Sequence, residues 1–473
     1  MSTWSIRGVI EGFYGPPWDW DHRKALMHWC YERGMTHYVY APKDDPLHRE
    51  RWRDPYPKQT LERFADLVAS NTLEVGFAIS PGLSINYHSS DDRQQLFAKL
   101  DQVTELGIAL VALLLDDIPV RPGLGADHAE LTQRLRDYLG DEIQLVLVPT
   151  EYTGTAPSPY LDALAAGVPD DVAIAWTGPT VVCDAITATM ARQRASVLGD
   201  RPPLLWDNYP VNDGMMADRL FLGPLRGRDP ALRNECWGYL ANPMVQPVAS
   251  KLPLASIAAF CRGEDPLQAW EQEASALGWR VLAESCDGTE PWRLVAQLAD
   301  SLARGDPAQS LAALVNWLRE AKACEAPGLE AEAAEWIDQT HTEASCALVA
   351  ARVIQACQTL RIVDRDGSAR VAPPHRKGVA ENAMALSFIW PAARRGTRSV
   401  FGPRASFRPV LSQWPDGEWR VHADCLSAHH NALDWLVELA LAECERLASN
   451  PNPPPTISVA HRDELPLPDS RLS

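Results

Sequence analysis

Residues 108–117 read IALVALLLDD, eight apolar residues followed at once by two aspartates. A continuous apolar run of this length is typical of a strand that is buried on both faces, as in a parallel sheet covered by helices. Two adjacent charges at the end of such a strand are costly unless they have partners. The segment therefore predicts an α/β fold with polar groups gathered at the end of this strand.

Seven further apolar runs alternate with helical patterns between the start of the chain and about residue 262. Eight strand–helix units in ~260 residues match a (β/α)8 TIM barrel in number and in size. The rival is a doubly wound open sheet, but its glycine-rich phosphate turn is missing, because residues 123–125 lack a third glycine and a preceding strand. The other predicted strands comprise residues 8–10, 38–41, 75–79, 145–148, 172–176, 204–206 and 236–240.

Helical periodicity fills the intervals between these runs. The first apolar stripe follows a candidate N-cap at Asp19 or Asp21 and ends before Gly34, which can adopt the left-handed conformation of a helix stop. Residues 61–68 and 96–103 carry the next two stripes. These segments are the helices that would cover the outside of the barrel.

The strand signals stop after the barrel, which we place at residues 1–262. Residues 264–362 are rich in Ala, Leu, Glu and Trp and predict a helical bundle. A mixed region, 364–450, follows and ends in an amphipathic helix over 432–447. The last segment, 451–473, is rich in proline and is expected to be disordered.

The composition disfavours several classes of function. The chain has 473 residues, 46% of them hydrophobic, and a formal net charge of −18. Such an excess of negative charge repels phosphate backbones and anionic membrane surfaces. The first residues lack the pattern of a signal peptide, and no apolar run reaches the ~18 residues of a membrane span. Ten scattered cysteines without a C-x-x-C pair indicate reduced thiols, so we expect a cytoplasmic protein with no nucleic-acid or membrane partner.

Polar and aromatic residues follow every predicted strand. The active site of a TIM barrel gathers at the carboxyl ends of its strands, so these residues are expected to share one mouth. Carboxylates, amides and flat rings suit a sugar, which offers hydroxyls to bind and apolar faces to stack on. The segments in question are residues 11–15, 41–45, 80–82, 116–117, 149–152, 176–179, 206–208 and 241–243.

Asp116 and Asp117 are the sharpest candidates. As a general acid near neutral pH, one of them would need a raised pKa, which crowding and partial burial can provide. The alternative is that they cap the next helix or pair with a cation, and their place at the barrel mouth favours a catalytic role. An ordinary glycosidase needs its two carboxyls ~5 to 9.5 Å apart across the scissile bond, which sequence neighbours span poorly. They suit substrate-assisted cleavage instead, in which a 2-acetamido oxygen of the sugar attacks the anomeric carbon to form an oxazoline.

Several other strand-end residues have two interpretations each. Lys43 could bind substrate or neutralise Asp44 and Asp45. The alternatives to a binding role are a turn for Asn208 and Asp213, core packing for Trp206, and a position away from the mouth for Tyr152.

Taken together, the strings at the strand ends resemble glycoside hydrolase family 84, the β-N-acetylglucosaminidases called O-GlcNAcases, some of which carry the label hyaluronidase. The resemblance runs in order through about residues 6–262, and it extends more weakly to the helices after 264. It implies a (β/α)8 barrel followed by a helical domain. The strings are GVIEGFYGPPW (8–18), YAPKDDPLHRERWRDPYP (40–57), ISPGLSINY (79–87), LLLDDI (113–118), VPTEY (148–152), WTGPTVV (176–182), WDNYPVND (206–213) and FLGPLRGR (221–228).

The resemblance also implies roles for individual residues. Asp116 would hold the acetamido N–H, and Asp117 would be the general acid and then the general base. Where animal members have an asparagine after the strand-eight Asn-Pro, the aligned residue here is Ser250, so that contact is in question. No metal or other cofactor is implied. The sugar would be bound by Gly12, Lys43, Asn208 and Asp213, with Tyr152 and Trp206 around the acetyl group.

The sequence therefore predicts a retaining exo-β-N-acetylglucosaminidase that removes terminal β-linked GlcNAc. Its expected partner is a GlcNAc-bearing glycoprotein, glycan or small glycoside, and the helical region could form a homodimer. Three alternatives stay open: a hydrolase that cleaves hyaluronan or another GlcNAc glycan, a GlcNAc-binding protein without turnover, and an acidic interaction protein.

Overall fold

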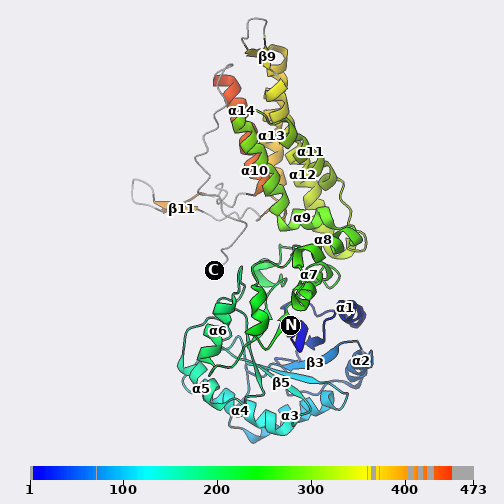
Figure 1. The fold of residues 1–473 in the computed structure, drawn as a ribbon, viewed down its shortest axis with the longest axis vertical. Helices are drawn as coiled ribbons and strands as arrows, with labels where there is room; N and C mark the ends of the chain where they lie inside the picture. Colours follow the sequence, from blue (N-terminus) through cyan, green and yellow to red (C-terminus); the bar gives the residue numbers. More distant parts are fainter. Residues whose placement is uncertain are drawn as a thin grey trace. The chain divides into compact units, whose positions relative to one another are not determined.

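The eight apolar runs form the strands of a closed, all-parallel barrel (Figure 1). The strands follow one another around the barrel in chain order, and β1 pairs with β8 to close it. This architecture confirms the predicted (β/α)8 barrel and rules out the open sheet. The strands are β1 (Ile6–Glu11), β2 (His37–Tyr40), β3 (Glu74–Ile79), β4 (Leu110–Leu114), β5 (Gln144–Val148), β6 (Ala173–Trp176), β7 (Leu204–Asp207) and β8 (Gly238–Ala241).

The structure is a computed structural model, and its contacts divide the chain into two compact units. One unit contains the barrel, up to Ala217 and again over Pro224–Glu273. The other contains Asp218–Gly223 and those of the described residues that follow Glu273. The described residues are 4–70, 72–359, 361–363, 369–371, 373–402, 410–413, 419–422 and 431–449.

Strand β4 explains why its sequence is apolar without interruption. Leu110, Ala112 and Leu114 belong to a cluster that collects residues from all eight strands, which is the interior of the barrel. Val111 and Leu113 belong to the larger cluster between the strands and the surrounding helices. Alternate side chains of a strand point to opposite faces, so a strand with core on both sides has no polar face.

The surrounding helices begin and end close to where the sequence predicts. The side chain of Asp19, one of the two candidate caps, accepts a hydrogen bond from the backbone N–H of His22 at the start of α1. Figure 1 shows α2 to α6 arranged around the strands. The helices of this unit are α1 (Trp20–Glu32), α2 (Lys58–Val68), α3 (Ser90–Thr104), α4 (Leu124–Leu139), α5 (Pro159–Gly167), α6 (Ala188–Val197) and α7 (Lys251–Arg262), with short 3-10 turns η1 (Gly214–Met216) and η2 (Pro230–Asn234).

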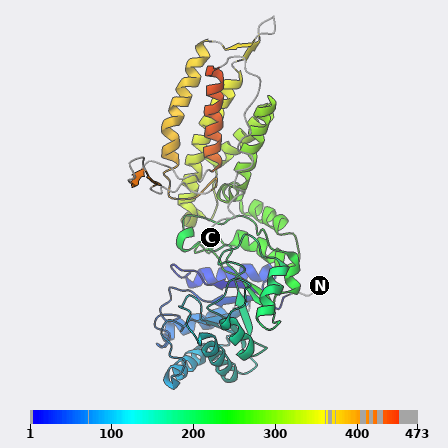
Figure 2. The same cartoon turned by 90° about the vertical axis from the view of Figure 1, so that its left-hand side faces the viewer.

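The second unit is a bundle of long helices. Helix α12 packs against α11, α13 and α14, and Figure 2 shows α13 and α14 running side by side. Its helices are α9 (Arg280–Asp287), α10 (Thr289–Arg304), α11 (Ala308–Lys322), α12 (Glu330–Thr359), α13 (Pro373–Ala393) and α14 (Ala432–Ser449), preceded by α8 (Pro266–Leu277). Two short antiparallel hairpins pair β9 (Arg361–Val363) with β10 (Ala369–Val371) and β11 (Val410–Gln413) with β12 (Trp419–His422).

The C-terminal part agrees with the sequence in one respect and adds a helix in another. The predicted amphipathic helix over 432–447 is α14, and Leu433, Leu436 and Val437 are buried on one side of it. The region expected to be mixed also contains the long helix α13. Residues 451–473 lie outside the described residues, and the division of the C-terminal part stays a prediction.

Two global expectations can be compared with the described residues. None of the nine cysteines among them forms a disulfide. None of the helices in the described ranges combines the length and the apolar character that crossing a membrane requires.

Candidate active site

One pocket lies at the carboxyl ends of the barrel strands, with a volume of about 200 Å³. Residues from loops after β1, β2, β4, β5, β6, β7 and β8 line it, which is where a TIM barrel carries its active site. All eight candidate residues named from the sequence line this one pocket. The lining residues are Gly12, Tyr14, Lys43, Asp116, Asp117, Val148, Tyr152, Thr177, Val181, Val182, Trp206, Asn208, Val211, Asp213, Met216 and Asn242.

Asp116 continues the alternation of β4. Leu114 faces the barrel interior, so the residue two positions later faces the same way, into the pocket. The side chain of Asp116 is 9% exposed, and its Oδ2 lies 2.5 Å from Nζ of Lys43. Its other oxygen, Oδ1, is buried and accepts no hydrogen bond within the described part of the chain. A buried carboxylate oxygen without a protein donor can accept a hydrogen bond from a ligand or from water.

Lys43 lines the pocket, and its role as a substrate ligand stays a prediction. Its ammonium pairs with Asp116 across the pocket floor, and its side chain is only 2% exposed. Asp44 and Asp45 have other partners: Asp44 accepts from the backbone N–H of Gly15, and Asp45 accepts from tyrosine hydroxyls, including that of Tyr40. Neutralising these two aspartates therefore does not account for Lys43.

Asp117 reaches the same pocket through an unusual backbone conformation. Its φ is +51°, in the left-handed region that most L-residues avoid and that aspartate tolerates. Without this turn, alternation would send Asp117 to the face opposite Asp116. The Asp117 carboxylate accepts hydrogen bonds from the hydroxyls of Tyr14 at 2.6 Å and Tyr152 at 3.0 Å. Both aspartates thus serve one cavity, with different partners.

The pKa of Asp117 is lowered, whereas crowding by Asp116 and partial burial were expected to raise it. Loss of water around the carboxyl raises the pKa, but the hydrogen bond from Tyr14, the charge of Lys43, the hydrogen bond from Tyr152 and the charge of Arg49 together outweigh it. The net pKa is lower than that of an ordinary aspartate. For Asp117, the residue expected to act as the general acid, the prediction of a raised pKa is therefore wrong, because two hydroxyl donors and two cations stabilise its carboxylate.

Tyr14 and Arg49 are site residues that the sequence reasoning did not single out. The Tyr14 hydroxyl donates to Asp117 and accepts from Nη1 of Arg49 at 2.6 Å. The backbone N–H of Tyr14 donates to Oδ2 of Asp213 at 2.7 Å. Burial raises the pKa of Asp213, outweighing two backbone hydrogen bonds that lower it. The signal available in the sequence was the aromatic pair of the GFYG string directly after β1.

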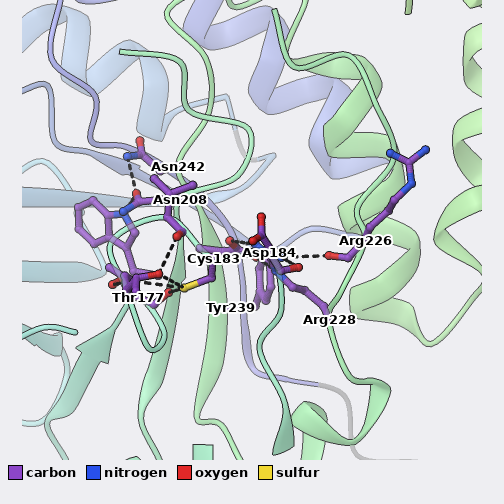
Figure 3. Close-up of polar contacts among 12 residues, drawn as sticks. Thr177, Cys183, Asp184, Asn208, Arg226, Arg228, Tyr239 and Asn242 are labelled. Carbon is purple, nitrogen blue, oxygen red and sulfur yellow. Dashed lines mark hydrogen bonds and ion pairs between the residues drawn. The ribbon is translucent and has the colours of Figure 1, made fainter. Parts of the chain in front are cut away.

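The opposite side of the pocket is a chain of amide hydrogen bonds (Figure 3). Asn208 Oδ1 accepts from Trp206 Nε1 at 2.9 Å and from Asn242 Nδ2 at 3.0 Å, and Asn242 Oδ1 accepts from the backbone N–H of Gly12 at 3.1 Å. A Cβ on Gly12 would lie 2.4 Å from Cζ2 of Trp206, so only glycine fits here without a shift of the indole. Trp206 is therefore a pocket wall as well as a buried residue.

Ser250 does not line this pocket. Its side chain is buried at the start of α7, where the hydroxyl accepts from the backbone N–H of Met244 at 3.1 Å and donates to the carbonyl of Gln246 at 2.8 Å. The asparagine that does line the pocket from this part of the chain is Asn242, at the end of β8. Within the described ranges, no group of three or more His, Cys, Asp or Glu side chains could hold a metal ion.

Comparison with known proteins places this geometry in a family. A family model described as β-N-acetylglucosaminidase matches residues 7–285. The protein O-GlcNAcases of Rattus norvegicus and Mus musculus are each 34% identical over 271 residues, which is 54% of this chain and 29% of the relative. The match therefore spans less than a third of the length of these relatives.

Solved structures share the fold over nearly the whole chain. A mutant of the O-GlcNAc hydrolase of Thermobaculum terrenum superposes with a TM-score of 0.74 at 23% identity and covers 94% of this chain and 96% of that chain. The family match begins at Arg7, the second residue of β1, and contains the other seven barrel strands and every residue that lines the pocket. This chain therefore belongs to the β-N-acetylglucosaminidase family of glycoside hydrolases, glycoside hydrolase family 84, as its strand-end motifs predicted.

Proposed function

We propose that this chain is a retaining exo-β-N-acetylglucosaminidase that cleaves terminal β-linked GlcNAc through an oxazoline intermediate. The observation that carries the proposal is the buried Oδ1 of Asp116, which accepts no hydrogen bond from any described residue, beside an Asp117 carboxylate held by two tyrosine hydroxyls. The first oxygen can accept an acetamido N–H, and the second group can exchange a proton with the glycosidic oxygen. A cavity of about 200 Å³ favours one terminal sugar over the interior of a chain.

In the first step, the acetamido oxygen of the substrate attacks the anomeric carbon while the bond to the leaving oxygen breaks. Asp117 gives its proton to that oxygen, and Asp116 accepts the amide N–H and stabilises the positive charge on the forming ring. In the second step, Asp117 takes a proton from water, the water oxygen attacks the anomeric carbon, and the oxazoline opens. Two inversions leave the β-configuration in the product.

The remaining pocket residues hold the sugar. Asp213 and the amide chain of Asn208 offer an acceptor and donors for sugar hydroxyls, and the Gly12 backbone lies beside them. Lys43 balances the charge of Asp116 and faces the same cavity. Trp206 and Tyr152 form the wall around the acetyl group. Positioning of this kind contributes to catalysis because the reacting groups must meet at near-contact distance.

The proposed physiological substrate is GlcNAc carried on protein, since the curated relatives are named protein O-GlcNAcases. A cytoplasmic location and a homodimer through the helical region stay predictions alongside it. The absence of a disulfide among the nine described cysteines favours a reducing compartment. A GlcNAc-serine peptide should be cleaved, and hyaluronan oligosaccharides should not. Preferred cleavage of hyaluronan would refute this substrate class and support the alternative of a hyaluronan-cleaving hydrolase.

The decisive test compares glycosides that differ in leaving group and in the 2-substituent. Asp117→Asn should lower kcat/KM for an alkyl β-GlcNAc by about 10²–10⁴-fold, the usual contribution of a general acid, and should affect an activated aryl glycoside far less. Equal losses on both substrates would refute the role of Asp117. Replacing the N-acetyl group by a hydroxyl should abolish turnover by the unaltered enzyme. Equal hydrolysis of the two sugars would refute substrate assistance. Binding of GlcNAc without any turnover would support the alternative of a GlcNAc-binding protein that is not an enzyme.

A further inference from the structure

The string FLGPLRGR (221–228) contains no residue to which the proposed chemistry gives a role, yet it ends at a buried arginine. The guanidinium of Arg228 pairs with Asp207 at the end of β7 through two hydrogen bonds, Nε to Oδ2 at 2.8 Å and Nη2 to Oδ1 at 2.7 Å. The two side chains are 4% and 1% exposed. Tyr239 on β8 donates a third hydrogen bond, at 2.5 Å, to the same carboxylate. The pair is rigid, because a planar fork matched to a carboxylate permits one orientation.

The remaining nitrogen of Arg228 binds a second element. Nη1 donates to the backbone carbonyl of Asp184 at 3.2 Å and to that of Arg226 at 2.9 Å (Figure 3). The chain approaches closely here, since a Cβ on Gly227 would lie 1.9 Å from the Asp184 oxygen, and Gly227 has a φ of +69°. The backbone N–H of Ile186 donates to the Gly227 carbonyl at 2.9 Å. Residues 227–228 are thus clamped onto the loop between β6 and α6.

Both ends of this clamp lead to the sugar pocket. Asp207 is followed at once by Asn208, the centre of the amide chain in the pocket wall. The β6–α6 loop supplies Val181 and Val182 to the same wall, and Asn208 Nδ2 donates to the Val181 carbonyl at 2.8 Å. Arg228 itself does not line the pocket. It therefore acts on the site through the two elements that it joins.

We propose that Arg228 is a positioning residue that fixes Asn208 against the β6–α6 loop and so sets the shape of the sugar pocket. This inference rests on the proposed function, since it assumes that Asn208 binds the substrate. Lysine at this position keeps the positive charge but loses the bidentate hydrogen bonds to Asp207. It also loses the contact with one of the two elements that Arg228 joins. Asn208 and the β6–α6 loop would then no longer be held in one position relative to each other, while Asp116, Asp117 and their partners stay unchanged.

The test is a double-mutant cycle with Arg228→Lys and Asn208→Ala. Each single variant should lower kcat/KM for an aryl β-GlcNAc on the order of tenfold to a hundredfold, the usual effect of a misplaced binding group. If Arg228 acts through Asn208, the double variant should lose no more than the larger single loss. The dependence of kcat/KM on leaving group should stay as in the unaltered enzyme, because proton donation is not involved. Arg226→Ala is the matched control: its side chain is exposed and points away from the cluster in Figure 3, so kcat/KM should not change.

Losses that add in the double variant would overturn the proposal, as would full activity of Arg228→Lys. If Arg228→Lys fails to fold, Tyr239→Phe takes its place in the cycle, because it removes one donor to Asp207 and keeps the ring. Full activity of Asn208→Ala would instead refute the proposed sugar contact of Asn208. A chain without GlcNAc hydrolysis would refute the proposed function, so the two failures are distinguishable.

Discussion

Replacing Tyr14 by phenylalanine is expected to extend activity to higher pH. Asp117 must carry a proton to act as the general acid, so activity on a poor leaving group falls as the pH rises through its pKa. The Tyr14 hydroxyl stabilises the ionised carboxylate and lowers that pKa. Removing the donor raises the pKa, and the alkaline limb of kcat/KM moves to higher pH. The substitution keeps the backbone N–H that donates to Asp213.

The size of the shift follows from the geometry. The hydroxyl lies 2.6 Å from Oδ2 of Asp117, and a sheltered hydrogen bond to a charged group contributes ~1.5–3 kcal/mol. Tyr14 is 41% exposed, so solvent weakens the bond, and we expect its contribution to fall below that range, at about 1 kcal/mol. Tyr152→Phe should act in the same direction with a smaller shift, because its bond to Asp117 is longer, at 3.0 Å.

The assay is the pH profile of kcat/KM for an alkyl β-GlcNAc, compared with an activated aryl glycoside. The alkaline limb should move for the alkyl substrate, while the aryl substrate, which needs no proton, should show little change. Tyr31→Phe, a tyrosine 52% exposed on α1, is the control and should leave both profiles in place. A limb that stays fixed, or that moves to lower pH, would refute the assignment of Tyr14 as a donor to the catalytic carboxylate.

Three further substitutions test other parts of the structure. Asp116→Asn should slow the first step for every leaving group, because the acetamido group loses its anionic acceptor and Lys43 loses its counter-charge; an unchanged kcat/KM on an activated aryl substrate would contradict this. Gly12→Ala should weaken binding of a thiazoline mimic of the oxazoline, since the new Cβ meets the Trp206 indole at 2.4 Å, and unaltered inhibition would count against that wall. Leu113→Ala should destabilise the barrel unit by about 2–5 kcal/mol in denaturant unfolding, because the side chain is fully buried.

The barrel was predictable because each of its strands has core on both faces. This double burial leaves an uninterrupted apolar run, as over 108–115, and the eight runs together indicate one closed sheet. Helix α13 was not predicted, because its apolar residues do not form one clear stripe and Pro391 lies inside it. A helix that is held by its neighbours rather than by its own pattern leaves little trace in sequence.

The positions of the site residues were predictable, but their partners were not. A strand end has a known place in a barrel, so Asp116 could be placed at the mouth from the order of the strands. The family resemblance then favoured a place in the same pocket for Asn208 and Tyr152. The hydrogen bond between Tyr14 and Asp117 joins residues 103 positions apart and depends on the conformation of two loops. The direction of the Asp117 pKa shift was predicted wrongly for the same reason, because the donors that lower it could not be seen.

The adjacency of the two aspartates has a structural requirement that sequence does not reveal. Neighbouring side chains of a strand point to opposite faces, so a continued strand would leave only Asp116 in the pocket. The left-handed φ of +51° at Asp117 ends the strand and returns the second carboxylate to the same cavity. Aspartate and asparagine tolerate this conformation better than alanine does. Asp117→Asn therefore removes the acid and keeps the backbone, whereas Asp117→Ala changes both, and a larger loss for alanine on an activated aryl substrate would measure the contribution of the turn itself.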